Sequence, residues 1–175
     1  MATTIKRVGF GQVEPNHLSA QRTAQIYAQL PAKSTLGNII ENGRFVKYDL
    51  ADGTTNLTGN GEWMLVYNEI KLYDDRRQMT KDYAMKKSDA VDGIMVPRVF
   101  KTNIGDIYTT NCVGGANTSE DNTYAGIELE VGDTLIVDST TGYLVEGTDN
   151  NMQWEVVKVY TMPDGQPGVK IVRVK

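Results

Sequence analysis

The sequence predicts a mainly β protein: a small β-barrel or β-sandwich body built from two similar β-meander units, with an extended N-terminal arm and one short helix. Three observations support this fold class. From residue 39 onward apolar and polar residues alternate, which is the period of a half-buried strand. Gly, Asn and Asp cluster between these runs, as they do in tight turns. One phrase, Glu-x-Gly followed by an alternating apolar run, Asp, and Gly four residues later, occurs twice.

The first residues predict an arm. Residues 1–16 are polar, rich in Gly and Thr, and show no usable periodicity. Chain ends of this kind are mobile unless they are tied down. We therefore expect a segment that is disordered in isolation and orders on a partner, with Phe10 and Val13 as its apolar anchors. Deleting residues 2–14 is then expected to leave thermal unfolding almost unchanged and to weaken partner binding.

A short helix is predicted next. The stretch SAQRTAQIYAQL, residues 19–30, is full of helix formers. It should end before Pro31, because the residue ahead of a proline avoids the α region. Residues 1–35 are thus expected to form the arm and helix, and residues 36–175 the β-rich body.

The body opens with a strand, a turn and a longer apolar run. RFVKYDL predicts a strand, and DGTTN predicts a turn in which Gly53 adopts a positive φ. The run at 61–73 has two partly apolar faces, one carrying Trp63 and Leu65 and the other carrying Met64, which suits a central strand.

A charge-dense insertion follows at residues 74–93. Opposite charges are mixed there, so we interpret it as a solvated helix or loop rather than a binding patch. If the insertion does contact an acidic partner surface, Arg76, Arg77 and Lys81 are the candidate residues.

The β pattern returns after this insertion. IMVPRVF and IGDIYTTN predict two strands joined by a short turn, and a Gly/Asn/Ser-rich loop follows them. The C-terminal residues predict a hairpin, with WEVVKVYTM and VKIVRVK flanking the turn PDGQPG.

The repeated phrase predicts that one β-meander unit is used twice, at about residues 40–73 and 128–160. We interpret its Gly residues as positive-φ turn positions, its Asp residues as turn caps and each Trp as a core residue heading a central strand. A shift of 89 residues, with a further slip of two for the Trp pair, aligns Glu41 with Glu130, Gly43 with Gly132, Val46 with Leu135, Asp49 with Asp138, Gly53 with Gly142, and Trp63 with Trp154. Equivalent glycines are expected to be equally intolerant of substitution.

The residues that carry chemistry are scarce. The single Cys112 allows no intramolecular disulfide, and a dyad between Cys112 and the single His17 has no supporting motif. A structural zinc site is excluded unless carboxylates dominate it. No nucleophile elbow, phosphate-binding loop or dinucleotide fingerprint occurs. We therefore predict a protein that is not an enzyme and that binds no metal or cofactor.

One enzymatic alternative remains open. Asp49, Asp138, Glu62 and Glu130 are candidates for the carboxylate pair of a glycoside hydrolase. Their position at turns favours capping, so catalysis is the weaker reading of these residues.

Charge and hydropathy limit the partners. With 18 Lys and Arg against 22 Asp and Glu, the formal net charge of −4 argues against broad nucleic-acid binding. No apolar run is long enough to span a membrane, and the first residues lack a signal-peptide core. We expect a protein made in a cytoplasm, with neither nucleic acid nor membrane as its partner.

A family resemblance points to a virion. The pattern V-G-D-T-L-x-V-x-x-x-T-G-Y-L followed by a Trp-led strand, together with ENGRFVKYDLADG and VVKVYTMPDGQPGVK, resembles the β-barrel units of tailed-bacteriophage capsid decoration or cement proteins. The resemblance covers about residues 40–73 and 128–175. It implies a non-enzymatic structural protein that binds the outside of the capsid and stabilises contacts between capsid subunits. Its partner would be the major capsid protein, its location the capsid, assembled in the host cytoplasm, and self-association is compatible with this role.

A binding module of another class is the alternative. A carbohydrate- or receptor-binding β module of a virion fibre or cell surface would need an exposed aromatic platform, for which Trp63, Tyr73 and Tyr143 are the candidates.

Overall fold

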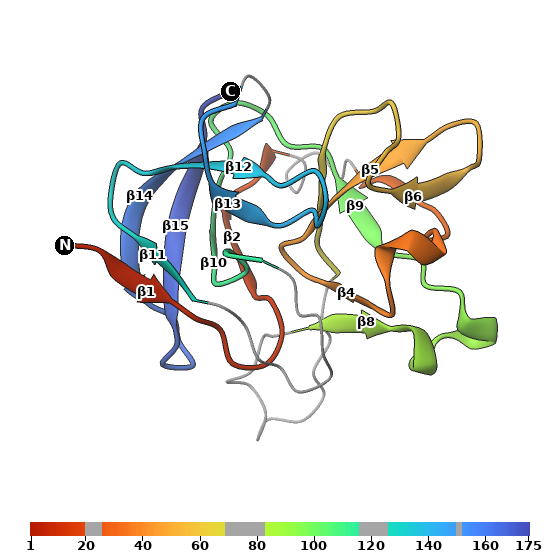
Figure 1. The fold of residues 1–175 in the computed structure, drawn as a ribbon, viewed down its shortest axis with the longest axis horizontal. Helices are drawn as coiled ribbons and strands as arrows, with labels where there is room; N and C mark the ends of the chain where they lie inside the picture. Colours follow the sequence, from red (N-terminus) through yellow and green to blue (C-terminus); the bar gives the residue numbers. More distant parts are fainter. Residues whose placement is uncertain (20–25, 69–82, 116–125, 150–151) are drawn as a thin grey trace.

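The computed structural model describes residues 1–19, 26–68, 83–115, 126–149 and 152–175 and is mainly β (Figure 1). A six-stranded antiparallel sheet, in the order β13-β12-β14-β15-β10-β2, curls into a half-barrel. A five-stranded antiparallel sheet has the order β3-β9-β7-β5-β6, and two ribbons pair β1 with β11 and β4 with β8. The helical turns that lie wholly within the described residues are all 3-10. Ser19 alone among the described residues is α-helical.

The bounds are β1 (Thr3–Ile5), β2 (Val13–His17), β3 (Ile26–Gln29), η1 (Ser34–Leu36), β4 (Ile39–Glu41), β5 (Phe45–Asp49), β6 (Thr54–Asn56), β7 (Met64–Val66), β8 (Ala84–Lys86), η3 (Lys87–Asp89), η4 (Val91–Gly93), β9 (Arg98–Phe100), β10 (Ile107–Thr110), β11 (Ile127–Leu129), β12 (Thr134–Val137), β13 (Leu144–Glu146), β14 (Gln153–Thr161) and β15 (Pro167–Arg173). The C-terminal hairpin is thus confirmed as β14 and β15, which pair along most of their length.

The main core lies between the six-stranded sheet, the β1–β11 ribbon and one face of β5 and β7. Its centre is Trp154, which is fully buried. The ring of Tyr108 meets Trp154 edge-on with centroids 5.0 Å apart, and Phe45 packs against it at 5.9 Å. These three aromatic rings join the two large sheets.

A second, smaller core fills the opposite face of the five-stranded sheet. Strand β7 separates the two cores, because alternate residues of a strand face opposite sides. Trp63 and Leu65 face the main core, and Met64 and Val66 face the second. The predicted central strand with two apolar faces is therefore confirmed, since β7 pairs with β5 on one side and β9 on the other.

The N-terminal segment is part of the fold, so the predicted free arm is wrong. Strand β1 pairs with β11, and β2 pairs with β10. Ile5 is 1% exposed and belongs to the main core. The polar composition misled the prediction, because several of these polar groups are themselves buried and hydrogen-bonded.

Arg7 is the residue that fixes this segment. Its guanidinium is fully buried and donates from Nε and Nη2 to Glu41 at 3.3 Å. It also donates to the carbonyls of Val113 at 3.2 Å and Gly115 at 2.9 Å. Glu41 accepts two further bonds, from the Gly11 N–H at 2.7 Å and the Tyr143 hydroxyl at 2.6 Å. A buried charge is tolerated only with such partners.

The prediction of a helix over residues 19–30 is wrong at its C-terminal end, although Ser19 is α-helical. Residues 26–29 form strand β3, which pairs antiparallel with β9. Residues 20–25 lie outside the described residues. A free partner strand outweighs the local helix propensity of this stretch. Of the charged insertion, residues 83–93 contain strand β8 and the two 3-10 turns η3 and η4, and the rest lies outside the described residues.

The two stretches that carry the repeated phrase have the same strand order, but neither is a meander. In a meander each strand pairs with the next, whereas here the first strand lies in the middle: β6-β5-β7 and β13-β12-β14. Corresponding backbone hydrogen bonds lie at the start of each stretch. The Gly43 N–H donates to the Val66 carbonyl at 2.9 Å, and the Gly132 N–H donates to the Val156 carbonyl at 2.8 Å. In the opposite direction, the Val66 N–H donates to the Arg44 carbonyl, and the Val156 N–H donates to the Asp133 carbonyl.

The strand register corrects the alignment of the two Trp residues. Val46 pairs with Met64, and its counterpart Leu135 pairs with Trp154. Met64 therefore occupies the position that corresponds to Trp154. Trp63 is one residue away and faces the other side of its sheet.

Both Asp residues cap their turns, as predicted. The Asp49 carboxylate accepts the N–H groups of Ala51 and Asp52 at 3.1 and 3.3 Å. The bond from Asp52 is the main cause of the lowered pKa of Asp49. Asp138 accepts the Thr140 N–H at 3.0 Å and a hydroxyl from Thr141.

The glycines of these turns are expected to differ in tolerance, contrary to the symmetry of the sequence. Gly53 and Gly142 both have positive φ, 63° and 77°. A Cβ at Gly53 meets no atom within 4 Å, whereas at Gly142 it would lie 2.2 Å from the Phe45 carbonyl oxygen. Gly53→Ala is expected to cost about 1 kcal/mol from backbone strain alone. Gly142→Ala adds a clash of about 1–3 kcal/mol. Urea unfolding of both variants tests this, and equal losses would contradict the close approach of the second turn to β5.

Candidate functional site

Of the predicted partner-binding residues, the structure describes Phe10 and Val13, and these two do not share a surface. Val13 is 4% exposed and packs inside the main core, so it offers no surface to a partner. Phe10 is half-buried beside Lys86, whose Nζ lies 5.2 Å from the ring centre, in a hollow of about 700 Å³. Arg76, Arg77 and Lys81 lie outside the described residues.

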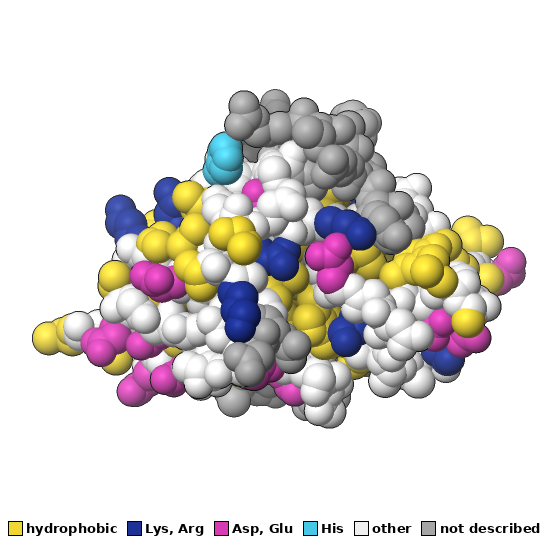
Figure 2. Space-filling view, turned by 90° about the horizontal axis from the view of Figure 1, so that it is seen from above, with side chains coloured by type: hydrophobic (Ala, Val, Ile, Leu, Met, Phe, Trp, Pro, Cys, Tyr) yellow, Lys and Arg dark blue, Asp and Glu magenta, His cyan; other side chains and the backbone are white. Residues whose placement is uncertain are grey.

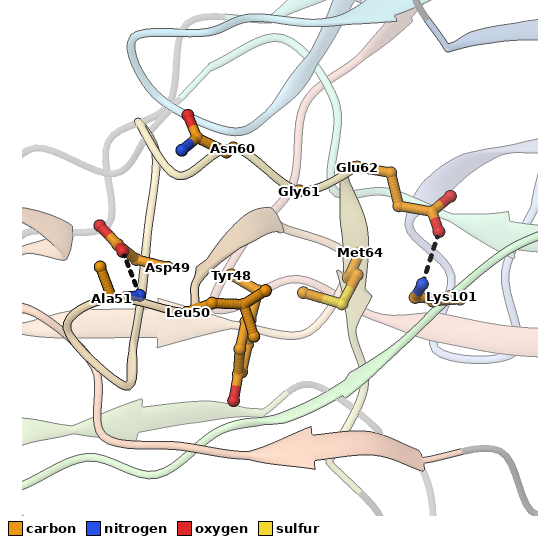
Figure 3. Close-up of a pocket in the computed structure, with 9 residues that line it drawn as sticks. All are labelled: Tyr48, Asp49, Leu50, Ala51, Asn60, Gly61, Glu62, Met64 and Lys101. Carbon is orange, nitrogen blue, oxygen red and sulfur yellow. Dashed lines mark hydrogen bonds and ion pairs between the residues drawn. The ribbon is translucent and has the colours of Figure 1, made fainter.

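The apolar groove is the better candidate for a binding site. We use this name for the hollow of about 280 Å³ lined by Tyr48, Asp49, Leu50, Ala51, Asn60, Gly61, Glu62, Met64 and Lys101 (Figure 3). Met64 and Tyr48 belong to or pack against the second core. The groove is thus the place where this core opens to the surface, between residues 48–51 and the nearby residues 60–64.

The turn after β5 holds an apolar side chain at the groove. Tyr48 follows Val46 on the same face of β5, so its ring continues the second core outward. Leu50 comes after the strand has ended, and the Asp49 cap holds the turn that presents it with 78% of its surface exposed. A single exposed apolar side chain is ordinary at a protein surface, so it is the adjoining hollow, not the exposure of Leu50 alone, that distinguishes this place.

The opposite wall is a tightly placed loop. Asn56 accepts the N–H groups of Thr58 at 2.9 Å and Gly59 at 2.6 Å, which fixes the loop start. A Cβ at Gly59 would lie 2.3 Å from the Tyr48 carbonyl oxygen, so only glycine lets the loop cross β5 this closely. The groove is therefore preformed rather than dependent on a rearrangement.

Paired charges border this region. Lys101 contacts Glu62 at 3.0 Å, and Lys33 contacts Asp52 at 2.7 Å, with all four side chains partly exposed. Figure 2 likewise shows basic and acidic side chains interspersed over one face of the molecule. The lining itself combines the Glu62–Lys101 ion pair and the hydrogen-bonded Asp49 carboxylate with an apolar floor, which suits an aliphatic or aromatic side chain of a partner.

The described residues offer little for catalysis. No group of three or more His, Cys, Asp and Glu among them is placed to hold a metal ion. Cys112 is fully buried, and burial raises the pKa of its thiol to about 12, which keeps it protonated and unreactive. His17 is exposed, so it does not share the environment of Cys112.

The candidate carboxylates have structural partners. Asp49 and Asp138 cap turns, and Glu62 pairs with Lys101. Glu130 lies 3.3 Å from the N-terminal amine.

Of the three aromatic residues proposed for a sugar platform, the two that the structure describes, Trp63 and Tyr143, are not exposed. Trp63 is 7% exposed and carries Lys47 over its ring, with Nζ 4.7 Å from the centre. Tyr143 is buried, its hydroxyl donates to Glu41, and burial and that carboxylate raise its pKa well above the usual value. Tyr73 lies outside the described residues.

The sequence reading missed the groove. The available signal was Leu50, an apolar residue inside the turn sequence DLADG, where polar residues are the rule. None of the helices among the described residues has the length and apolar character needed to span a bilayer. Comparison with known proteins gives no match to any family model, curated protein or solved structure.

Proposed function

We propose that this chain is a non-enzymatic structural protein of a tailed-bacteriophage virion that binds the outer surface of the capsid and stabilises contacts between capsid subunits. The resemblance of residues 40–73 and 128–175 to capsid decoration proteins supports this role, as does the mainly β body. In this proposal the major capsid protein is the partner and the protein resides on the capsid, assembled in the host cytoplasm. Self-association around a local symmetry axis is compatible with the role.

The apolar groove is the observation that carries the proposal. A preformed apolar hollow beside an exposed leucine is suited to a protein contact, because apolar anchors and the pockets they fill dominate interface energetics. A shell presents the same surface many times. Modest contacts to several neighbouring subunits then add through multivalency.

The fixed N-terminal segment changes how the protein would act on a shell. An arm that orders on docking would lose conformational entropy at that step. Here Arg7 and strands β1 and β2 are already ordered within the body. The body itself is therefore the proposed contact element, and it docks with little ordering cost.

We further infer that residues 41–66 and 130–156 are two copies of one structural unit. Their common strand order and corresponding backbone bonds support this. In this unit the first strand would lie between the other two, whereas the sequence predicted a meander, in which each strand pairs with the next.

Leu50→Asp tests the role of the groove. The variant is expected to fold normally, because the side chain is 78% exposed, and to bind capsids at least about tenfold more weakly through loss of an apolar anchor. Val131→Asp is the matched control, since Val131 is also largely exposed but lies outside the groove. Binding is measured by co-sedimentation with purified capsids that lack the protein. Equal binding of both variants and wild type would remove the groove from the interface.

Tryptophan fluorescence distinguishes the capsid-binding proposal from the carbohydrate-binding alternative. The proposal expects blue-shifted emission that added glycans do not quench, since both Trp residues are buried. Red-shifted emission quenched by glycans would favour the carbohydrate-binding alternative.

A further inference from the structure

The chain contains two Asn–Gly dipeptides, Asn42–Gly43 and Asn60–Gly61. This dipeptide is the one most prone to deamidation, because a glycine without a Cβ lets its backbone nitrogen reach the preceding side-chain amide. The nitrogen attacks the amide carbon, ammonia leaves, and a succinimide forms. Water then opens the ring at either carbonyl, giving aspartate or isoaspartate. Whether a site reacts depends on how freely the Asn side chain and the Gly nitrogen can move.

In the first dipeptide, hydrogen bonds hold both the Asn42 side chain and the Gly43 nitrogen, the two groups that must move for the reaction. Asn42 is buried, donates its amide to the Asn68 carbonyl at 3.0 Å and accepts the Asn68 N–H at 2.8 Å. The Gly43 nitrogen, which would be the nucleophile, donates to the Val66 carbonyl at 2.9 Å. A Cβ at Gly43 would lie 2.6 Å from Cys112, so the backbone has no room to rotate.

The second dipeptide is open. Both Asn60 and Gly61 are exposed, in an irregular stretch between β6 and β7. Within the described residues, neither the Asn60 side chain nor the Gly61 N–H makes a hydrogen bond. Figure 3 shows the Asn60 side chain at the rim of the apolar groove, directed away from its floor. A Cβ at Gly61 would approach no atom closer than 3.5 Å, so the backbone has space to rearrange.

We propose that Asn60 is a site of spontaneous deamidation in the folded protein, whereas Asn42 reacts only when the chain unfolds. The reaction consumes one water, releases one ammonia and needs no other reactant. Its product places a new negative charge on the groove rim, next to Glu62 and Asp49. The isoaspartate product also lengthens the backbone beside Gly59, which has no space against β5. This last expectation rests on the proposed function: the product is expected to weaken docking of a capsid side chain in the groove as the protein ages.

Paired incubations of folded and denatured protein in mildly alkaline buffer test the assignment. Peptide mapping by mass spectrometry gives the rate at each Asn, and isoaspartyl methyltransferase labelling identifies the isomer. In the denatured chain both sites are expected to react at similar rates. In the folded protein Asn60 should keep nearly that rate. Asn42 should slow about a hundredfold or more, because the site must first open and each tenfold corresponds to about 1.4 kcal/mol.

Two variants make the result specific. Gly61→Ala, at an exposed position with space for a Cβ, should slow the reaction at Asn60, and Asn60→Gln should abolish it. Equal protection of Asn60 and Asn42 in the folded protein, or equal reaction of both, would overturn the assignment. Asn60→Asp then tests the consequence in the capsid co-sedimentation assay. Normal binding of that variant would overturn the link to docking, whereas the rates decide the chemistry independently of any capsid.

Discussion

Arg7→Met is expected to lower the free energy of unfolding by about 3–5 kcal/mol, because it leaves a buried carboxylate without its cation. Glu41 would lose both bonds from the guanidinium, and the carbonyls of Val113 and Gly115 would lose the bonds that Arg7 donates to them. Guanidinium unfolding followed by circular dichroism measures the loss. On the same grounds, deleting residues 2–14 is now expected to unfold the protein rather than spare its stability.

Two further variants separate burial from charge. Lys33→Met removes the cation of a half-exposed pair with Asp52 and is expected to cost less than about 1 kcal/mol. Adding Glu41→Gln to Arg7→Met removes the stranded charge and should recover part of the loss. If Arg7→Met costs no more than Lys33→Met, the N-terminal segment is not fastened to the body and the original expectation of a free arm returns.

Trp154→Ala is expected to cost about 3–5 kcal/mol, as a large-to-small change at the centre of the main core. The variant removes the ring that contacts both Tyr108 and Phe45, so the two large sheets lose their shared aromatic contact. Guanidinium unfolding followed by circular dichroism gives the number without relying on the deleted fluorophore.

Trp154→Phe is the control for this variant. Within the described residues the indole N–H has no hydrogen-bond partner, so phenylalanine sacrifices volume but no polar contact. The free energy of unfolding should fall clearly less for Trp154→Phe than for Trp154→Ala. A cost below about 1 kcal/mol for Trp154→Ala would contradict a core centred on this ring.

The strands were predictable where the signal is local. Alternation identified β5, β7 and the β14–β15 hairpin, because a residue's face on a strand depends only on its position parity. The turn roles of Asp49 and Asp138 were equally local, since each carboxylate bonds to N–H groups two or three residues further on.

The N-terminal segment was not predictable by the same means. Arg7 is 34 residues from Glu41 and more than a hundred from the carbonyls it reaches. No local pattern announces such partners, so buried polar residues looked like solvated ones. The prediction for residues 26–29 was wrong for a related reason, because β9, the partner of strand β3, lies some seventy residues further along the chain. Pairing with that strand overrides helix propensity.

The groove depends on non-local placement as well. It requires the turn after β5, the loop before β7 and Lys101 after β9 to meet. The sequence contained one clue, a leucine in a turn, but not the hollow beside it. The offset between the two Trp residues was also hidden, because a one-residue difference in register changes the face but not the appearance of the pattern.

A cryo-electron microscopy map of the capsid with the protein bound shows directly whether the protein occupies the outer surface of the shell. We expect density for the β body on the outer surface, bridging neighbouring capsid subunits, with Leu50 and the apolar groove facing the shell. A map without the protein on the shell would contradict the proposed function. A map in which the groove faces solvent would contradict the proposed contact.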